Sequence, residues 1–253
     1  MNGFGLLLAK EMREQLRTTR LIVVLGVFAA FGILSPALAK EMPEVIKAAG
    51  GNMQITVPTP TVRDAVQQFA KNVGQIGALI AILISMGAVA TEKERGTAGF
   101  LLTKPVGREE FLFGKIASIA ILLGLGLALA GLLTAVYTAV LFEQPLSAAG
   151  TVASIALLWL SLAVYAAITF LASVTTRSAL VAGGVGFGAF MAAGLVSALP
   201  SVGAYTPGSL SAPAVTLALG LPSGDLAGPI LVNLLLIALA IGAAGLAFRG
   251  QEL

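Results

Sequence analysis

Six long apolar stretches, none containing a charged residue, constrain the fold of this sequence more than any other feature. Each is close to or above the roughly 20 residues that a helix needs to cross the hydrocarbon core of a bilayer. The runs are continuously apolar and do not alternate at period two, which favours helices over barrel strands. We therefore expect an all-α polytopic membrane protein with one transmembrane domain over residues 1–253. The six spans are predicted at about residues 21–39, 74–91, 116–142, 151–174, 179–199 and 226–248.

The overall composition excludes several other classes of protein. Charged residues make up 11% of the 253 and hydrophobic residues 57%, whereas soluble domains carry about 25% charged residues. The sequence has no Cys and no His, so disulfide frameworks, cysteine–histidine zinc sites, catalytic thiols and imidazole bases are excluded. We expect no catalytic residue, no cofactor-binding residue and no metal ligand in this chain, and no nucleic-acid partner.

The basic residues predict how the spans are oriented. Of the 15 Lys and Arg residues, 11 fall on the side of the two termini and 4 on the other side. Because cytoplasmic loops are enriched in Lys and Arg, both termini are predicted to face the cytoplasm, in a multi-pass protein of the cytoplasmic (inner) membrane. The 11 are Lys10, Arg13, Arg17, Arg20, Lys93, Arg95, Lys104, Arg108, Lys115, Arg177 and Arg249, and the other 4 are Lys40, Lys47, Arg63 and Lys71.

Residues 1–20 are predicted to form an interfacial helix on the cytoplasmic leaflet. Leu8, Met12 and Leu16 recur every four residues and therefore lie along one helical face. Arg13 and Arg17 occupy the rest of the circumference, which is the pattern of an amphipathic helix at a membrane surface. A solvated charged tail is the alternative interpretation.

Two longer segments are predicted on the opposite side of the membrane. Residues 40–73 contain Gly-Gly and Pro breakers, and their last part, residues 62–73, can form a short helix before the second span. Residues 200–225 carry four prolines around a mostly apolar piece that is too short to span. Such a piece suggests a re-entrant or interfacial segment, or an outer loop packed on the bundle.

The spans as drawn contain no ionisable side chain, and such residues usually mark proton paths and voltage sensors. Their absence argues against a proton-coupled transporter, while sodium coupling through hydroxyls and carbonyls stays open. Small residues are frequent instead, as in the Gly183–Gly188 cluster of the fifth span, where helix packing is the simplest interpretation.

The charged hairpin at residues 92–115 is the most informative segment. Charged residues of both signs are predicted to extend the helix of the second span beyond the bilayer. Gly96-Thr97 then breaks this helix, and Pro105 ends the short apolar piece that follows. An apolar helix held between charged helix ends is typical of a docking element for a partner protein. A tight connection whose apolar side chains fold back onto the bilayer is the alternative. The residues predicted to take part are Glu92, Glu94, Gly96, Thr97, Phe100, Leu101, Leu102, Pro105 and Arg108.

This hairpin resembles the hallmark of ABC type-2 exporter permeases, a Glu-x-Glu-x-Gly-Thr stretch followed by Leu-Leu, Pro, Arg and Gly-Lys. The similarity extends from the interfacial helix through six spans to a Phe-Arg-x-x-x-Leu ending at residues 248–253. It is closest to the branch that includes the permease of the nitrous-oxide-reductase maturation system. The matching residues in the hairpin are Glu92, Glu94, Gly96, Thr97, Leu101, Leu102, Pro105, Arg108, Gly114 and Lys115.

The resemblance implies a division of labour between subunits. Permeases of this family do not hydrolyse ATP, and this chain lacks a Gly-x-x-x-x-Gly-Lys-Ser/Thr phosphate loop, so it is not expected to be an enzyme. By resemblance, residues 97–103 would be a coupling helix seated in an ABC ATP-binding subunit, present in two copies, which binds ATP and Mg. A second permease copy or paralogue and the lipid bilayer complete the expected partners. The second and fifth spans would line the substrate path between the two permeases.

Three functions are therefore compared. The first is the permease subunit of an ABC exporter, which predicts that an ATPase subunit co-purifies with the chain. The second is a stand-alone secondary transporter or channel, which transport in liposomes without ATP would favour. The third is a non-transporting membrane anchor, which ATPase activity without movement of cargo would favour.

Overall fold

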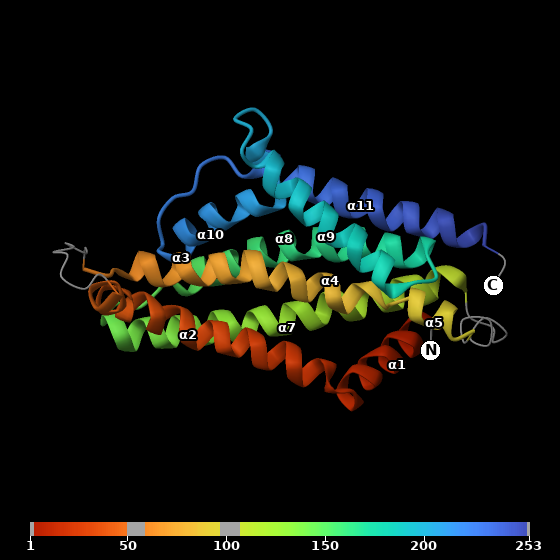
Figure 1. Ribbon diagram of the computed structural model, residues 1–253, viewed down its shortest axis with the longest axis horizontal. Coiled ribbons are helices and arrows are strands. Elements are labelled where there is room, and N and C mark those ends of the chain that lie inside the picture. The colour runs from red at the N-terminus through yellow and green to blue at the C-terminus, as the bar shows by residue number, and fades with distance from the viewer. Residues whose placement is uncertain (1–2, 50–58, 97–106, 252–253) are drawn as a thin grey trace.

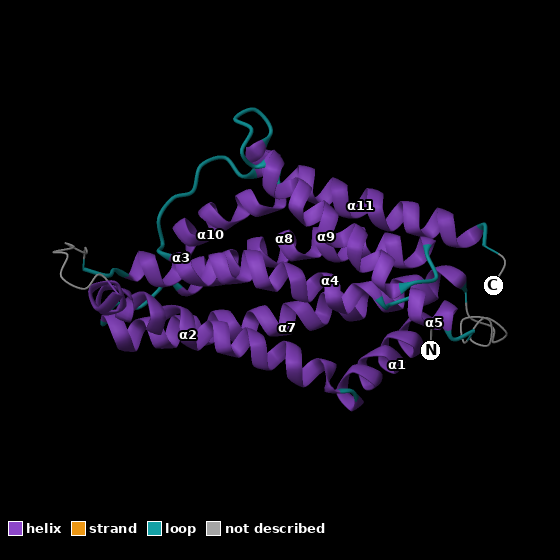
Figure 2. Cartoon of the chain, in the orientation of Figure 1, coloured by secondary structure: helices purple, strands orange, loops and turns teal. Residues whose placement is uncertain are grey.

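The computed structural model describes residues 3–49, 59–96 and 107–251, and every regular element within these ranges is a helix. Six helical stretches in this part of the chain are long and apolar enough to cross a membrane. This confirms the prediction of an all-α polytopic membrane protein with six spans. The helices form one elongated bundle with both chain ends at the same end (Figures 1 and 2).

Most spans are single helices. The first span is α2 (Thr19–Ala49), and the third to sixth are α7 (Arg108–Phe142), α8 (Ala148–Thr175), α9 (Ala179–Val196) and α11 (Ala227–Arg249). The second is a composite of α3 (Val62–Asn72), the π-helix η1 (Val73–Gly77), α4 (Ala78–Met86) and α5 (Ala90–Glu94). The remaining elements are α1 (Gly3–Arg17), the 3₁₀-helices η2 (Gly203–Tyr205) and η3 (Pro207–Leu210), and α10 (Ser211–Ala218).

Two helices extend beyond the apolar stretches that predict them. α2 continues ten residues past the expected end of the first span, because the charged residues that follow are mostly good helix formers. α7 begins at Arg108, so the charged lead into the third span is part of the same 35-residue helix. At 1.5 Å per residue α7 is about 52 Å long, which exceeds the roughly 30 Å of hydrocarbon.

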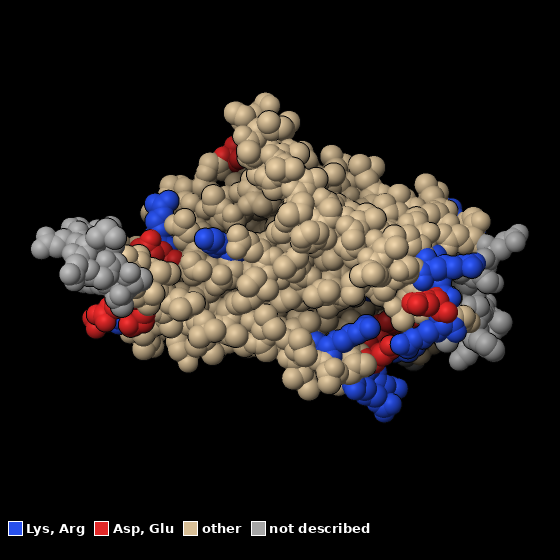
Figure 3. Space-filling model, in the orientation of Figure 1, with Lys and Arg blue, Asp and Glu red and all other residues tan. Residues whose placement is uncertain are grey.

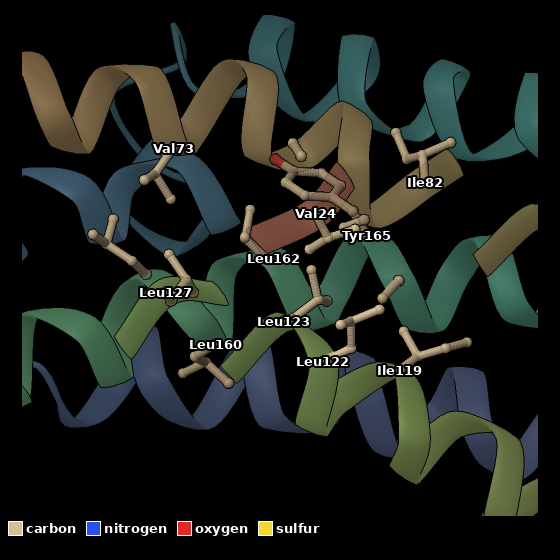
Figure 4. Packing of buried hydrophobic residues seen from close by; sticks show 14 of the residues in the cluster. Val24, Val73, Ile82, Ile119, Leu122, Leu123, Leu127, Leu160, Leu162 and Tyr165 are labelled. Carbon is tan, nitrogen blue, oxygen red and sulfur yellow. The ribbon is translucent and has the colours of Figure 1, made fainter. Parts of the chain in front are cut away.

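α8 is the central helix of the bundle. In its most apolar window 67% of the residues are buried, against 17% for α9 and for α11. α8 packs against α4, α7, α9, α10 and α11. Figure 4 shows Leu162 of α8 in one continuous apolar cluster with Val24, Ile82 and Leu123 from three other spans. The outermost helices, α9 and α11, therefore present most of their surface to lipid or to a partner.

The contact between α8 and α9 requires a glycine. A Cβ atom built on Gly186 would lie 2.1 Å from Oγ1 of Thr169, so a larger residue would push the two helices apart. Gly184 and Gly188 of the same cluster meet no heavy atom within 4 Å. Part of the fifth-span glycine cluster thus serves packing inside the chain, and part lies on the free side of α9.

Residues 200–225 form a packed segment at the end of the bundle away from the termini. α10 lies against α8 and α3, and its last residue, Ala218, accepts a hydrogen bond of 3.2 Å from the backbone N–H of Ser147. Within this segment, α10 therefore packs on the bundle, and the prediction of a re-entrant or interfacial segment or of an outer loop stays a prediction.

Candidate functional site

The candidate site lies at the end of the bundle that carries both termini, where α1, α5, α7 and α11 meet. Figure 3 shows basic and acidic side chains gathered at this end, while the middle of the visible face is almost uncharged. Glu92 and Glu94 belong to α5, Gly96 follows that helix, and Arg108 is the first residue of α7. The other predicted docking residues, Thr97, Phe100, Leu101, Leu102 and Pro105, lie outside the described residues.

α5 is separated from the rest of the second span by a break at residues 87–89. A break leaves backbone N–H groups without their helical acceptors. Here the hydroxyl of Ser173, a fully buried residue of α8, accepts hydrogen bonds from the N–H groups of Val89 (3.0 Å) and Ala90 (2.9 Å). The far end of α5 is closed by Gly96, whose φ of 68° lies in the left-handed region that favours glycine. α5 is therefore a short helix whose first N–H groups are satisfied by one α8 side chain.

A buried ion cluster ties α5 to α1 and α7. The Nζ atom of Lys115, on α7, lies 2.7 Å from a carboxylate oxygen of Glu92 and 3.1 Å from one of Glu11 on α1. The Lys115 side chain is only 6% exposed, and its ammonium also lies 5.1 Å from the centre of the Phe111 ring. A buried ammonium needs such partners because leaving water costs several kcal/mol. Lys115 thus joins three elements far apart in the sequence.

A second polar contact reinforces the attachment of α1. The side-chain amide of Gln15 donates a 3.1 Å hydrogen bond to the hydroxyl of Ser118, which in turn donates to the carbonyl of Lys115. Glu11 and Gln15 are four residues apart and lie on one face of the helix. The face of α1 that packs on the bundle is therefore partly polar.

The predicted interfacial residues of α1 lie mostly away from this contact. Leu8 and Met12 are half-buried, and Leu16 is 64% exposed. Arg13 and Arg17 are exposed. An exposed leucine next to exposed arginines is compatible with a helix at a membrane surface.

The opposite side of α5 contacts the chain's C-terminal residues. The Lys93 ammonium donates to the carbonyl of Val174 at the end of α8 and to the side chain of Gln251. It also lies 5.8 Å from the centre of the Phe248 ring, which stacks on Phe111. α5 is therefore held on one side by α1 and α7, and on the other by the ends of α8 and α11.

A polar pocket of about 230 Å³ lies between α1, the end of the second span and α7. Its lining includes Glu14, Gln15, Arg20, Glu92 and Lys115. No group of three or more acidic residues among the described residues is arranged to hold a metal ion.

Several residues of this site were not singled out by the sequence. Lys115 was matched only as part of the motif, and Glu11, Gln15, Ser118, Ser173 and Gln251 had no predicted role. One sequence signal could have indicated this contact. Glu11 and Gln15 are polar residues four positions apart on a helix that also carries an apolar stripe, so they share one face of that helix. Glu94, by contrast, is exposed and forms no ion pair with any residue in the described ranges.

A protein family and two known proteins match parts of the chain. Residues 6–221 match the family described as ABC-2 family transporter protein. The chain is 27% identical over 113 residues to an uncharacterized transmembrane protein, YxlG, of Bacillus subtilis (strain 168), covering 43% of each chain. It is 30% identical over 134 residues to the probable ABC transporter permease protein NosY of Stutzerimonas stutzeri, covering 51% of this chain and 45% of NosY. The matches thus span less than half the length of these relatives.

Proposed function

Because the chain belongs to the ABC-2 family of transporter proteins, we propose that it is the transmembrane permease subunit of an ATP-driven exporter. In this proposal it forms the substrate pathway and hydrolyses no ATP. A separate ABC ATP-binding subunit, in two copies, carries ATP and Mg and docks on residues 97–103. The similarity to a probable ABC transporter permease supports this assignment over a stand-alone transporter or a membrane anchor.

The observation that carries the proposal is the attachment of α5. Residues 97–106 connect α5 to α7, and a partner that moved this connection would pull on both helices. α5 joins its span through a break, and its Glu92 shares a buried lysine with α1. Force on the docking segment would therefore reach α1, α7 and α8 directly. This arrangement suits an element that couples an external ATPase to the spans.

The same proposal places the charged end of the bundle in the cytoplasm, in the inner membrane. By sequence, 11 of the 15 basic residues are predicted on the side of the two termini, in agreement with the enrichment of Lys and Arg on the cytoplasmic side. ATP is available on that side.

A second permease copy or paralogue is part of the proposal. The side of α9 that faces away from α8 carries Gly184 and Gly188, which are open to close approach by another helix. Leu180 and Leu195 on the same helix are 81% and 77% exposed. These features support contact between two copies along the fifth span.

Reversal of the charge at Glu94 is the test of docking, because this side chain is exposed and makes no ion pair within the described ranges. The tagged chain would be purified in mild detergent from its own membranes, and the associated proteins identified by mass spectrometry. For Glu94→Lys we expect loss of the ABC ATP-binding subunit and of most associated ATP hydrolysis, with the thermal stability of the chain unchanged.

Glu41→Lys is the matched control. Glu41 is also an exposed glutamate, but it lies in the C-terminal part of α2, away from the docking segment. It should leave both the bound subunit and the ATP hydrolysis intact. Retention of full assembly and transport by Glu94→Lys together with substitutions at Leu101 and Leu102 would reject the docking proposal. Transport by the chain alone in liposomes without ATP would reject the subunit assignment.

A further inference from the structure

A separate cavity of about 500 Å³ opens between α3, η1, α8, α9 and α10. It lies in the half of the bundle away from the two termini and from the ion cluster around Lys115. Figure 3 shows a hollow on this face, with basic side chains beside it and acidic side chains nearby. Its volume is within the range of ligand-binding pockets, about 300 to 1,000 Å³.

One wall of the cavity is a row of polar side chains on the second span. Arg63, Gln67, Lys71 and Gln75 recur every four residues, are all exposed, and all line the cavity. At 1.5 Å per residue the row is about 18 Å long. The opposite side of α3, including Val66 and Phe69, is buried in the core. The row is therefore turned toward the cavity by the packing of α3.

The two charges on this wall are both positive, and no acidic residue in the described part of the chain lines the cavity. Neither Arg63 nor Lys71 forms an ion pair with any residue in the described ranges. The two cations are eight residues apart, about 12 Å along the helix. A group with negative charge would satisfy them through charge-assisted hydrogen bonds.

The remaining walls are mainly apolar. Tyr165 of α8 packs edge-to-face on Phe190 of α9, with ring centres 5.3 Å apart. Leu158, Leu162, Met191 and Val215 also line the cavity. Such a surface favours an alkyl chain over a polar solute, because burial stabilises each CH₂ by about 0.8 kcal/mol.

We propose that this cavity binds an anionic amphiphile. A phosphate or carboxylate head contacts Arg63 and Lys71, and an alkyl chain lies along Tyr165, Phe190 and Met191. The ligand is either a lipid of the surrounding bilayer or a single-chain molecule of the same chemistry. The site uses no part of the docking segment, so it does not depend on the ATPase partner.

The test uses the full chain in phosphatidylcholine nanodiscs. The chain has no Cys, so Ala212→Cys, at the rim of the cavity, can carry a single polarity-sensitive fluorophore. Three probes are titrated separately: phosphatidylglycerol, dodecyl phosphate and inorganic phosphate. We expect a saturable fluorescence change with at least one of the two amphiphiles and none with inorganic phosphate. In Lys71→Gln and in Arg63→Gln, about tenfold weaker binding is expected, as for the loss of one charged hydrogen bond.

Lys40→Gln is the matched control, because it removes a charge from the same half of the bundle but does not line the cavity. Lys71→Arg should retain binding. Saturation by phosphatidylglycerol assigns the site to a bilayer lipid, and saturation by dodecyl phosphate alone assigns it to a single-chain ligand. The proposal is overturned if inorganic phosphate binds as well as the amphiphiles. It is equally overturned if neither amphiphile saturates, or if Lys40→Gln weakens binding as much as Lys71→Gln.

Discussion

At the scale of single residues, Lys115 is a buried charge with two ion-pair partners. Its ammonium contacts two carboxylates from different elements while its side chain is almost fully buried. The nearby Lys10, which is exposed, belongs to the same electrostatic environment. Burial works against the charge of Lys10, but the carboxylates of Glu11, Glu92 and Glu14 outweigh it and raise the pKa of Lys10 above its usual value. The cluster therefore carries more acid than Lys115 alone neutralises.

Lys115→Met should strongly destabilise the chain. The substitution removes the buried cation shared by the partly buried carboxylates of Glu11 and Glu92, and removing one partner of a buried ion pair costs about 3 kcal/mol or more. Lys10→Met removes an exposed partner of Glu11 and Glu14 and should cost less than about 1 kcal/mol. Unfolding of both variants in mixed detergent would measure the difference. Equal stability of the two variants would show that the buried contacts of Lys115 contribute nothing.

At the scale of elements, the second span differs from the other five. It is built from four helical pieces, with a π-helix in the middle and a break before α5. A π-helix and a break both interrupt the regular hydrogen-bonding pattern, and such positions often mark functional sites. Each interruption lies beside one of the two sites described above. Residues of η1 line the cavity that we propose binds an amphiphile, and the break at residues 87–89 precedes α5 and the docking segment. The other spans are continuous helices that support it.

Ser173→Ala should loosen α5. Without the hydroxyl, the N–H groups of Val89 and Ala90 lose their acceptor, at a cost of about 2 kcal/mol. Hydrogen exchange of the α5 amides should accelerate while the amides of α8 stay protected. Ser85→Ala provides the control, since the buried Ser85 hydroxyl has no hydrogen-bond partner among the described residues. Unchanged exchange in Ser173→Ala would mean that α5 is held by its side-chain contacts alone.

At the scale of the whole molecule, the bundle is asymmetric in burial. α8 is enclosed by other helices, whereas α9 and α11 have most of their surface free. Small residues on a free helix face allow another helix to approach closely. Both exposed helices carry such open positions, Gly184 and Gly188 on α9 and Gly242 and Gly245 on α11. The proposed assembly takes α9 as the contact between two copies, because the family resemblance places the fifth span between the two permeases.

Gly188→Cys should form an intermolecular disulfide under mild oxidation in native membranes. The chain has no other Cys, so any cross-linked dimer reports the introduced position. Leu239→Cys, on α11 with an exposure of 68%, should stay monomeric under the same conditions. Cross-linking is read by non-reducing electrophoresis. Efficient cross-linking at Leu239 and none at Gly188 would contradict the proposal, because the contact between the two copies would then lie on α11 and not on α9.

The sequence alone determined the fold class, because runs of about 20 uncharged apolar residues have one stable solution in a bilayer. It also located the charged hairpin, since those residues are contiguous and include the matching motif. It did not reveal that Glu11, Glu92 and Lys115 form one cluster, or that Ser173 holds the break before α5. These partners are 23 to 104 residues apart, and nothing local specifies which polar groups meet. Only the packing of α1, α5, α7 and α8 decided those contacts, because a buried charge or N–H must find its partner within the folded bundle.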